Sequence, residues 1–235
     1  MDISIRDTGL FGHVDVTLDP GDTFSSEAGA LFKMSSNTQL ETAVRQRGPD
    51  GGGILGAAKR LLGGASFFLT HYSSKDGQPA KMSFAPTMPG DCAQIEANRE
   101  CRWYCTGGSW IGCGGEVRIE TEFAGFKKGF AGGEGLFYIV CKGRGPILIS
   151  AFGKIHKIEI DGEYYVDSGH VVAYQDSLSV DVGNASGAGF SGFITSGLVG
   201  EGFVMKFKGK GTVYTQSHSP TSLGQSVGPT LPERS

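Results

Sequence analysis

Apolar and polar residues alternate with a period of two along much of the chain. Val14, Val16 and Leu18 alternate with polar neighbours, and the stretches 117–123 and 178–182 do the same. Such alternation is typical of β-strands that bury one face against a core. Turn signals separate these stretches, at Pro20-Gly21-Asp22, Asp76-Gly77, Pro89-Gly90-Asp91 and Asp161-Gly162. The pattern predicts an all-β protein.

Two glycine-containing signatures each occur three times. The first opens each copy, at Gly21, Gly90 and Gly162, and the second closes it, at Gly64, Gly133-Glu134-Gly135 and Gly200-Glu201-Gly202. Both signatures shift by 69 residues from the first copy to the second, and by 72 and 67 residues to the third. The shared spacing predicts one body over 1–216 made of three tandem small β-barrel units, at 8–80, 81–152 and 153–216.

Further positions follow the repeat. Gly29, Asn98 and Gly169 lie seven or eight residues after each opening, where a positive φ is expected. A glycine pair or its remnant recurs near each end, at 75–77, 143–145 and 209–211. Two segments depart from the strand pattern. Helical spacing predicts a short helix over 54–62, and the Ser-, Pro- and Gly-rich composition of 217–235 predicts a flexible tail.

Composition narrows the function further. Glycine contributes 39 of 235 residues and the net charge is −3, without the basic excess that nucleic-acid binding requires. The one basic and aromatic run is Lys206-Phe207-Lys208 with Lys210. The chain shows neither a signal or transit peptide nor an apolar run long enough to span a membrane, and its five cysteines suit a reducing compartment. These features predict a cytoplasmic protein and do not favour nucleic acid as a partner.

A set of motifs marks a resemblance. It comprises Pro20-Gly21-Asp22, 27–31, 59–64, 133–137, 143–145, Phe152-Gly153, 166–173 and 200–202. Together these resemble the altered-inheritance-of-mitochondria (mitochondrial biogenesis) family over roughly residues 8 to 216. The resemblance implies a fold like that of the tryptophan RNA-binding attenuation protein, a short variant of the double-stranded β-helix. It also implies a homotrimer with nine barrels in a ring, and it brings no catalytic residues.

The sequence predicts no enzymatic, metal or cofactor site. Cys92, Cys101, Cys105 and Cys113 lie within 22 residues, but only Cys101 and Cys105 have knuckle spacing, so we interpret them as packing residues on one strand face. The five histidines are isolated, and His170 is interpreted as a structural or interface residue. The string 187–192 matches a dinucleotide-binding pattern without the helix that such a site needs.

Apolar residues gather before each closing signature. In the three copies they are Ile54, Leu55, Leu61 and Leu62; Phe126 and Phe130; and Phe193, Ile194 and Leu198. One hypothesis is packing on neighbouring units, and the other is contact with a membrane surface or protein partner. We therefore expect a non-enzymatic scaffold or binding ring. The alternative is a binder of a small molecule or single-stranded nucleic acid in grooves between the units.

Overall fold

The computed structural model describes residues 1–7, 9–46, 66–123, 137–184 and 203–231. Strands make up most of this part of the chain, which confirms the all-β prediction. They are β1 (Asp2–Arg6), β2 (His13–Leu18), β3 (Phe24–Glu27), β4 (Leu31–Met34), β5 (Thr38–Gln46), β6 (Ser66–Ser74), β7 (Ala80–Phe84), β8 (Cys92–Ala97), β9 (Trp103–Thr106), β10 (Trp110–Gly114), β11 (Arg118–Phe123), β12 (Phe137–Lys142), β13 (Gly145–Ser150), β14 (Ile155–Asp167), β15 (Val171–Gln175), β16 (Leu178–Asn184) and β17 (Phe203–Gln216).

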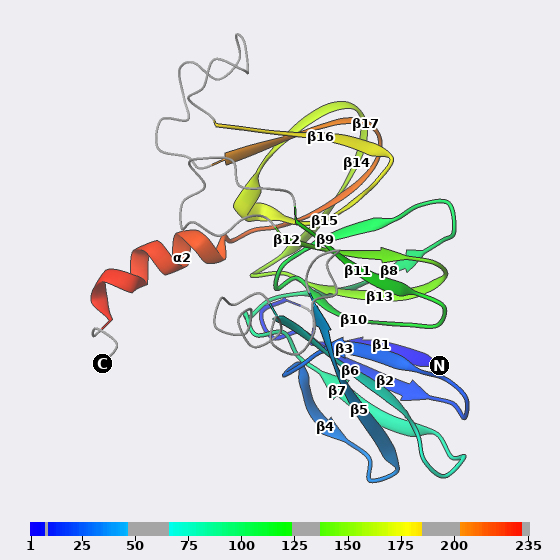
Figure 1. Ribbon diagram of the computed structural model, residues 1–235. Helices are drawn as coiled ribbons and strands as arrows, with labels where there is room; N and C mark the ends of the chain where they lie inside the picture. The colour runs from blue at the N-terminus through cyan, green and yellow to red at the C-terminus, as the bar shows by residue number, and fades with distance from the viewer. Residues whose placement is uncertain (8, 47–65, 124–136, 185–202, 232–235) are drawn as a thin grey trace.

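The strands form three sheets stacked from one end of the molecule to the other. Their orders are β1-β2-β7-β4, then β5-β6-β3-β10-β13-β8, then β11-β12-β9-β15-β17-β14, with β16 added on β17. In Figure 1 the first sheet lies at the lower end, the last strands lie at the upper end, and the N-terminus faces right. The order along the chain therefore runs along the stack.

Three apolar clusters hold the layers together. Phe24, Phe84 and Leu148 belong to the first, Trp110 and Ile149 to the second. The third cluster is formed by strands of the last sheet, β16 included, around the fully buried side chains of Met205 and Phe207. Burying such side chains contributes about 1.5–3 kcal/mol each. Along strands such as β2, buried residues alternate with less buried ones, as the period-two pattern predicted.

The same pairing scheme occurs three times along the chain. The first set of strands is β2–β7, the second is β8–β13, and the third is β14–β17, in which β14 and β17 each supply two successive strands. In every set the first strand pairs with the last, the last with the third, the fourth with the fifth, and the fifth with the second. The third strand carries a bulge at the same place in each set, beside Phe32, Ile111 and Val172. The predicted bounds of three tandem units stay a prediction, which this recurrence supports.

The glycine signatures need correction, because the three openings are not equivalent. Gly21 lies between the first and second strands of its set, whereas Gly90 precedes the first strand of the next set. Gly162 does not form a turn: it continues β14 opposite Gly209, and both have positive φ, of 124° and 126°. A strand bend at these two glycines therefore replaces the predicted turn.

The other repeat predictions have mixed outcomes. Gly29 has the expected positive φ, of 96°, but Asn98 and Gly169 do not; the matching conformation in the second set belongs to Gly108, with φ 82°. Asn98 instead forms a bridge with Cys101. The predicted glycine pairs have different settings. Residues 75–77 and 143–145 lie at the connections between the fifth and sixth strands of their sets, whereas 209–211 lies inside the continuous strand β17.

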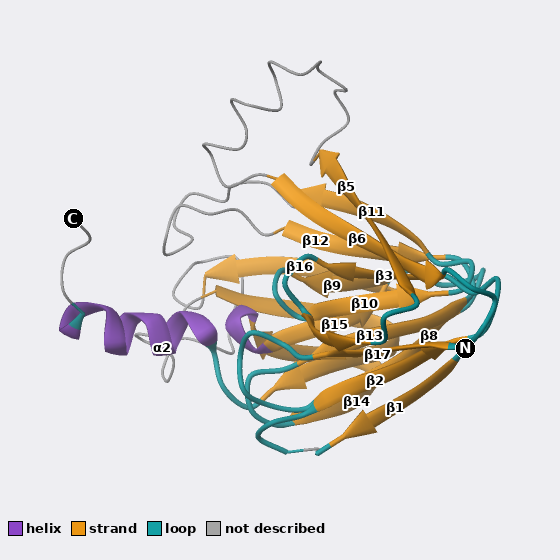
Figure 2. Ribbon diagram, turned by 90° about the horizontal axis from the view of Figure 1, so that it is seen from below, coloured by secondary structure: helices purple, strands orange, loops and turns teal. Residues whose placement is uncertain are grey.

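The helical elements also differ from the expectation. The predicted helix over 54–62 lies outside the described residues. Within the part described, helical structure is η1 (Ser168–His170), α2 (Pro220–Val227) and η2 (Gly228–Thr230). Helix α2 lies where composition predicts a flexible tail, because Ser219 caps it by accepting a hydrogen bond from Ser222 N and Pro220 occupies its first turn. Figure 2 shows α2 extending away from the strands.

The buried carboxylate of Asp91, just before the second strand set, links the segment that precedes the first set to the start of the third. It accepts hydrogen bonds from Gly9 N and from Ile155 N at 3.2 Å, and it forms an ion pair with Lys154 Nζ at 2.9 Å. Burial alone would raise the pKa of Asp91, but the Lys154 ammonium and the two backbone donors outweigh it and lower the pKa below its usual value. The charged form therefore stabilises the fold.

We expect Asp91→Asn to lower the free energy of unfolding by about 1.5–3 kcal/mol at pH 7, because hydrogen bonds to a charged group are lost. The folded-state pKa of Asp91 lies below the unfolded value, so its contribution is present above that unfolded value and disappears as pH falls through the folded one. Urea unfolding at pH 7 and at pH 3 measures the difference. An equal cost at both pH values contradicts the assignment.

Candidate functional site

Two strand edges that lie at opposite ends of the stack stand out as a candidate interaction site. Between strand sets, the second strand of one set pairs with the third strand of the next, as β3 does with β10 and β9 with β15. The first set has no set before it and the third has none after it. Consequently β4 and the second half of β14 each keep one edge without a strand partner among the described residues.

These two edges expose apolar side chains that are buried at the equivalent positions elsewhere. Phe32 and Met34 on β4 are 54% and 48% exposed, and Tyr164 on β14 is 44% exposed. In the second set, Ile111, Cys113 and Trp103 occupy the equivalent positions and are all buried. Tyr165, next to Tyr164, is also exposed. At the two junctions inside the chain a neighbouring strand covers these positions, and the β4 and β14 edges lack such a strand in the part of the chain described.

The internal junctions also define a register for the two edges. Cys113 pairs with Ser25 at the first junction, and Tyr174 pairs with Tyr104 at the second. The same register aligns Met34 on β4 with Tyr165 on β14. Exposed strand edges with apolar side chains are templates for pairing with another chain.

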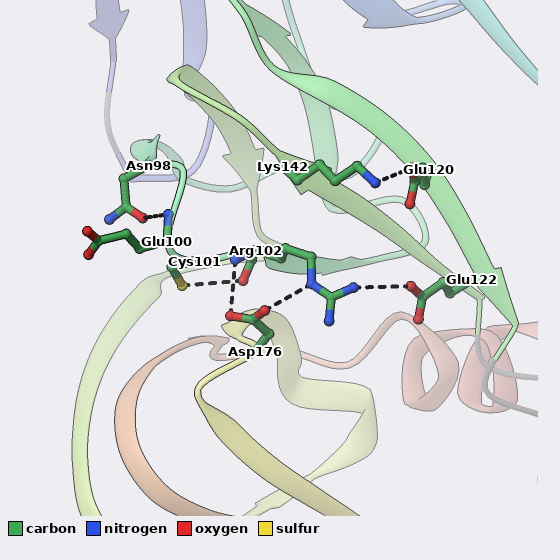
Figure 3. Close-up of polar contacts among 8 residues, drawn as sticks. All are labelled: Asn98, Glu100, Cys101, Arg102, Glu120, Glu122, Lys142 and Asp176. Atoms are coloured by element: carbon green, nitrogen blue, oxygen red, sulfur yellow. Dashed lines mark hydrogen bonds and ion pairs between the residues drawn. The ribbon is translucent and has the colours of Figure 1, made fainter.

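A groove at the junction of the second and third sets forms a second candidate site. It has a volume of about 270 Å³ and is lined by eight residues: Arg102, Tyr104, Glu122, Tyr138, Tyr174, Asp176, Leu178 and Val180. Figure 3 shows the Arg102 side chain between Asp176 and Glu122. Arg102 Nε donates to Asp176 Oδ2 at 2.9 Å, whereas Arg102 Nη1 lies 4.0 Å from Glu122 Oε1.

Three tyrosines form the floor of this groove. The Tyr104 and Tyr174 rings stack with centroids 5.1 Å apart, and Tyr138 packs edge-on against both. Burial raises the pKa of all three phenols, that of Tyr138 to about 12, so they stay protonated at neutral pH. The Arg102 guanidinium lies 5.8 Å from the centroid of the Tyr104 ring. The groove is therefore aromatic at its base and charged at its rim.

The structure agrees with the predicted packing role for three of the four clustered cysteines and differs at Cys101. Cys92, Cys105 and Cys113 are buried, whereas Cys101 lies before β9, is partly exposed and does not share the Cys105 environment. Burial raises the pKa of the Cys101 thiol to about 11. Among the residues described, no group of three metal-ligating side chains comes together. The His170 Nδ1 atom lies 2.8 Å from the Gln216 carbonyl oxygen, a structural contact.

The basic run on β17 faces acidic partners. Lys206 and Lys208 both pair with Glu163, at 3.0 and 3.6 Å, and Lys210 pairs with Asp161 at 3.8 Å. Each lysine therefore has a carboxylate beside it, which leaves little of the positive field that a phosphate backbone needs.

The apolar residues singled out in the sequence lie outside the described residues. They are Ile54, Leu55, Leu61, Leu62, Phe126, Phe130, Phe193, Ile194 and Leu198, together with the signature glycines Gly64, Gly133, Gly135, Gly200 and Gly202. The strands that bound these segments are described, however. Each segment joins the fourth and fifth strands of a set, which pair up to Gln46 with Ser66, Phe123 with Phe137, and Asn184 with Phe203.

Sequence reasoning missed the strand edges and the residues that line the groove, although it allowed for grooves between the units. Phe32, Met34, Tyr164 and Tyr165 look like ordinary members of alternating strands. Only a register alignment of the three sets shows that two strands lack the partner that their counterparts have. For the groove, Arg102 and Asp176 are 74 residues apart, and no local motif connects them.

No helix among the described residues is long and apolar enough to cross a bilayer. The described residues thus form an all-β stack in which one strand-pairing scheme occurs three times. Among the strands described, the β4 and β14 edges lack the partner strand that their counterparts in the other sets have. The family described as mitochondrial biogenesis AIM24 matches residues 3–218, so the chain belongs to that family.

Two relatives agree with this assignment. An uncharacterised protein of Streptococcus pyogenes serotype M6 is 31% identical over 210 residues, which cover 88% of this chain and 82% of that protein. The crystal structure of a Streptococcus pyogenes protein is similar over 98% of this chain and 99% of its own, with a TM-score of 0.74 and 27% identity. The fold is therefore that of a solved structure along nearly its whole length.

Proposed function

We propose that the protein is a non-enzymatic scaffold that assembles head to tail into a closed homotrimeric ring. One observation carries this proposal: β4 and β14 are the two halves of a strand junction that the chain already builds twice internally. When β14 of one copy pairs with β4 of the next, it completes a third antiparallel sheet built from two strand sets, β16-β17-β14-β4-β7-β2-β1. Head-to-tail contacts of this kind give rings when the rotation closes.

The exposed side chains support this assembly. Pairing the two edges covers Phe32, Met34, Tyr164 and Tyr165, the same set that makes the isolated chain an aggregation risk. Three copies are what the family resemblance implies, and three strand sets per copy give nine around the ring. All five cysteines are free, which supports a reducing compartment such as the cytoplasm.

Light scattering on the purified full-length chain tests the assembly. The proposal predicts a mass three times the 24.7 kDa of one chain, independent of concentration in the micromolar range. A single-chain mass, or a mass that grows without limit as filaments form, contradicts it.

The strands that bound the three apolar segments occupy equivalent places in the three sets, so the attachment points of the segments recur in every set. We propose that these segments contact a membrane surface or a protein partner. Flotation with anionic liposomes tests the membrane contact, with Phe126→Ser and Phe130→Ser as variants. If the wild-type chain does not float, or if the variants float equally well, the membrane contact is rejected. Neither result bears on the proposed ring.

A further inference from the structure

We propose that the groove between the second and third strand sets binds a small organic cation, such as a quaternary or primary ammonium. The site consists of the Tyr104, Tyr138 and Tyr174 rings with Glu122 and Asp176 at the rim. This binding site is separate from the proposed ring, because all of its residues belong to one chain.

The fold does not require these side chains. The junction of the first and second sets is built from the same strand pairing, so each groove residue has a counterpart there. Thr23 stands in the position of Arg102, Ser25 in that of Tyr104, Leu69 in that of Tyr138, Cys113 in that of Tyr174 and Gly115 in that of Asp176. These five counterparts are uncharged and none is aromatic, although the His71 ring lies beside Ser25 and is hydrogen-bonded to it at 2.7 Å. The three-tyrosine cluster with its ion pair at the second junction therefore points to a role other than holding the strands together.

The charge of the groove selects the sign of the ligand. Arg102 supplies one positive charge, against the two carboxylates of Asp176 and Glu122. Asp176 is engaged by the Arg102 Nε atom at 2.9 Å and by the Arg102 backbone N–H at 3.1 Å. Glu122 lies 4.0 Å from the guanidinium and its side chain is 46% exposed, so it keeps acceptor capacity for a second cation. An anion entering the groove meets two carboxylates.

The aromatic floor selects the kind of cation. Ring faces attract ammonium and guanidinium groups, most strongly when the groups are desolvated. The Arg102 guanidinium over Tyr104 is an example already present in the chain. A volume of about 270 Å³ lies just below the range of about 300–1,000 Å³ usual for ligand pockets, which limits the ligand to a small molecule. A methylated ammonium combines small size with a weakly hydrated charge.

Titration of the full-length chain with tetramethylammonium chloride and with agmatine, followed by tyrosine-ring NMR, tests the site. We expect shifts confined to the Tyr104, Tyr138 and Tyr174 rings. Glu122→Gln removes the rim charge and should weaken binding about tenfold. Glu120→Gln is the matched control, because Glu120 lies on the same strand, pairs with Lys142 and does not line the groove. Tyr104→Leu should abolish the shifts, and Tyr104→Phe should retain them.

Three outcomes overturn the proposal. These are no saturable shifts with either cation, equal affinity in the Glu122→Gln and Glu120→Gln variants, or tighter binding of phosphate than of the cations. Repeating the titration on an edge variant such as Met34→Glu separates this site from the ring, since the groove lies within one chain. Cation binding that persists in a single-chain form supports the site even where the ring proposal fails.

Discussion

Replacing Met34 by glutamate should convert the ring into single chains. In the proposed register Met34 on β4 faces Tyr165 on β14 of the next copy, so the Met34→Glu variant would bury a carboxylate against an aromatic ring. The nearby Lys206 ammonium already pairs with Glu163 at 3.0 Å, so the added carboxylate lacks a cation of its own. An unpaired charge at a buried contact costs several kcal/mol, enough to separate an interface of a few strands. Light scattering should then report the 24.7 kDa of one chain.

A charge pair tests the register itself. Tyr165→Lys alone should also weaken the ring, because it sets a lysine beside Met34 and next to Lys206, which already lies 5.6 Å from the Tyr165 ring centroid. Combining Met34→Glu with Tyr165→Lys places opposite charges face to face across the junction. We expect the double variant to regain the threefold mass.

A matched control uses an exposed apolar residue away from both edges. Val227 on α2 is 41% exposed, and Val227→Glu should leave the mass unchanged. If Val227→Glu dissociates the ring as Met34→Glu does, or if the double variant stays dissociated as the single variants do, the β4–β14 junction is wrong.

Gly90→Ala should be the most damaging single substitution inside the chain. Gly90 forms a parallel bridge with Gly153 where the second and third sets meet. An added Cβ would lie 2.0 Å from the Ala151 carbonyl oxygen and 2.5 Å from the Gly153 nitrogen. Both are backbone atoms that cannot rotate away. We expect a loss of at least about 3 kcal/mol in the free energy of unfolding, at the upper end for overpacked sites.

Chemical denaturation measures this loss, and Gly224→Ala provides the control. Gly224 lies in α2 with nothing within 4 Å of an added Cβ, so alanine there should leave global stability unchanged or slightly raised. A Gly90→Ala chain as stable as the wild type would mean that the three sets do not approach as closely as the structure has them.

The fold class could be predicted because alternation is a local property. The stretches from Val14 and from Leu178 became β2 and β16, and the glycine pairs at 75–77 and 143–145 lie at the connections between the fifth and sixth strands of their sets. The opening signatures misled because glycine serves two different purposes. At Gly21 it forms a turn, with φ 92°, whereas at Gly90 it allows two backbones to touch. Spacing alone does not distinguish these uses.

The candidate sites depended on pairing that no local pattern contains. Met34 and Cys113 occupy the same place in two strand sets, yet one is exposed and the other buried, because only Cys113 has the strand of a preceding set beside it. Likewise Arg102 and Asp176 meet only after β9 and β15 pair. A groove between units could therefore be expected from the repeat, but its chemistry needed the register.

The sheets are out of phase with the sequence repeat. The middle sheet takes β5, β6 and β3 from the first set and β10, β13 and β8 from the second, so its seam runs between β3 and β10. A fragment cut at a repeat boundary, for example after residue 84, keeps half of that sheet and strips Phe24 and Tyr72 of part of their packing. In the proposed ring, the smallest piece that buries both of its faces is set by where the ring closes and not by where a repeat ends. We therefore expect a chain lengthened or shortened by whole strand sets to form a ring with a different number of copies.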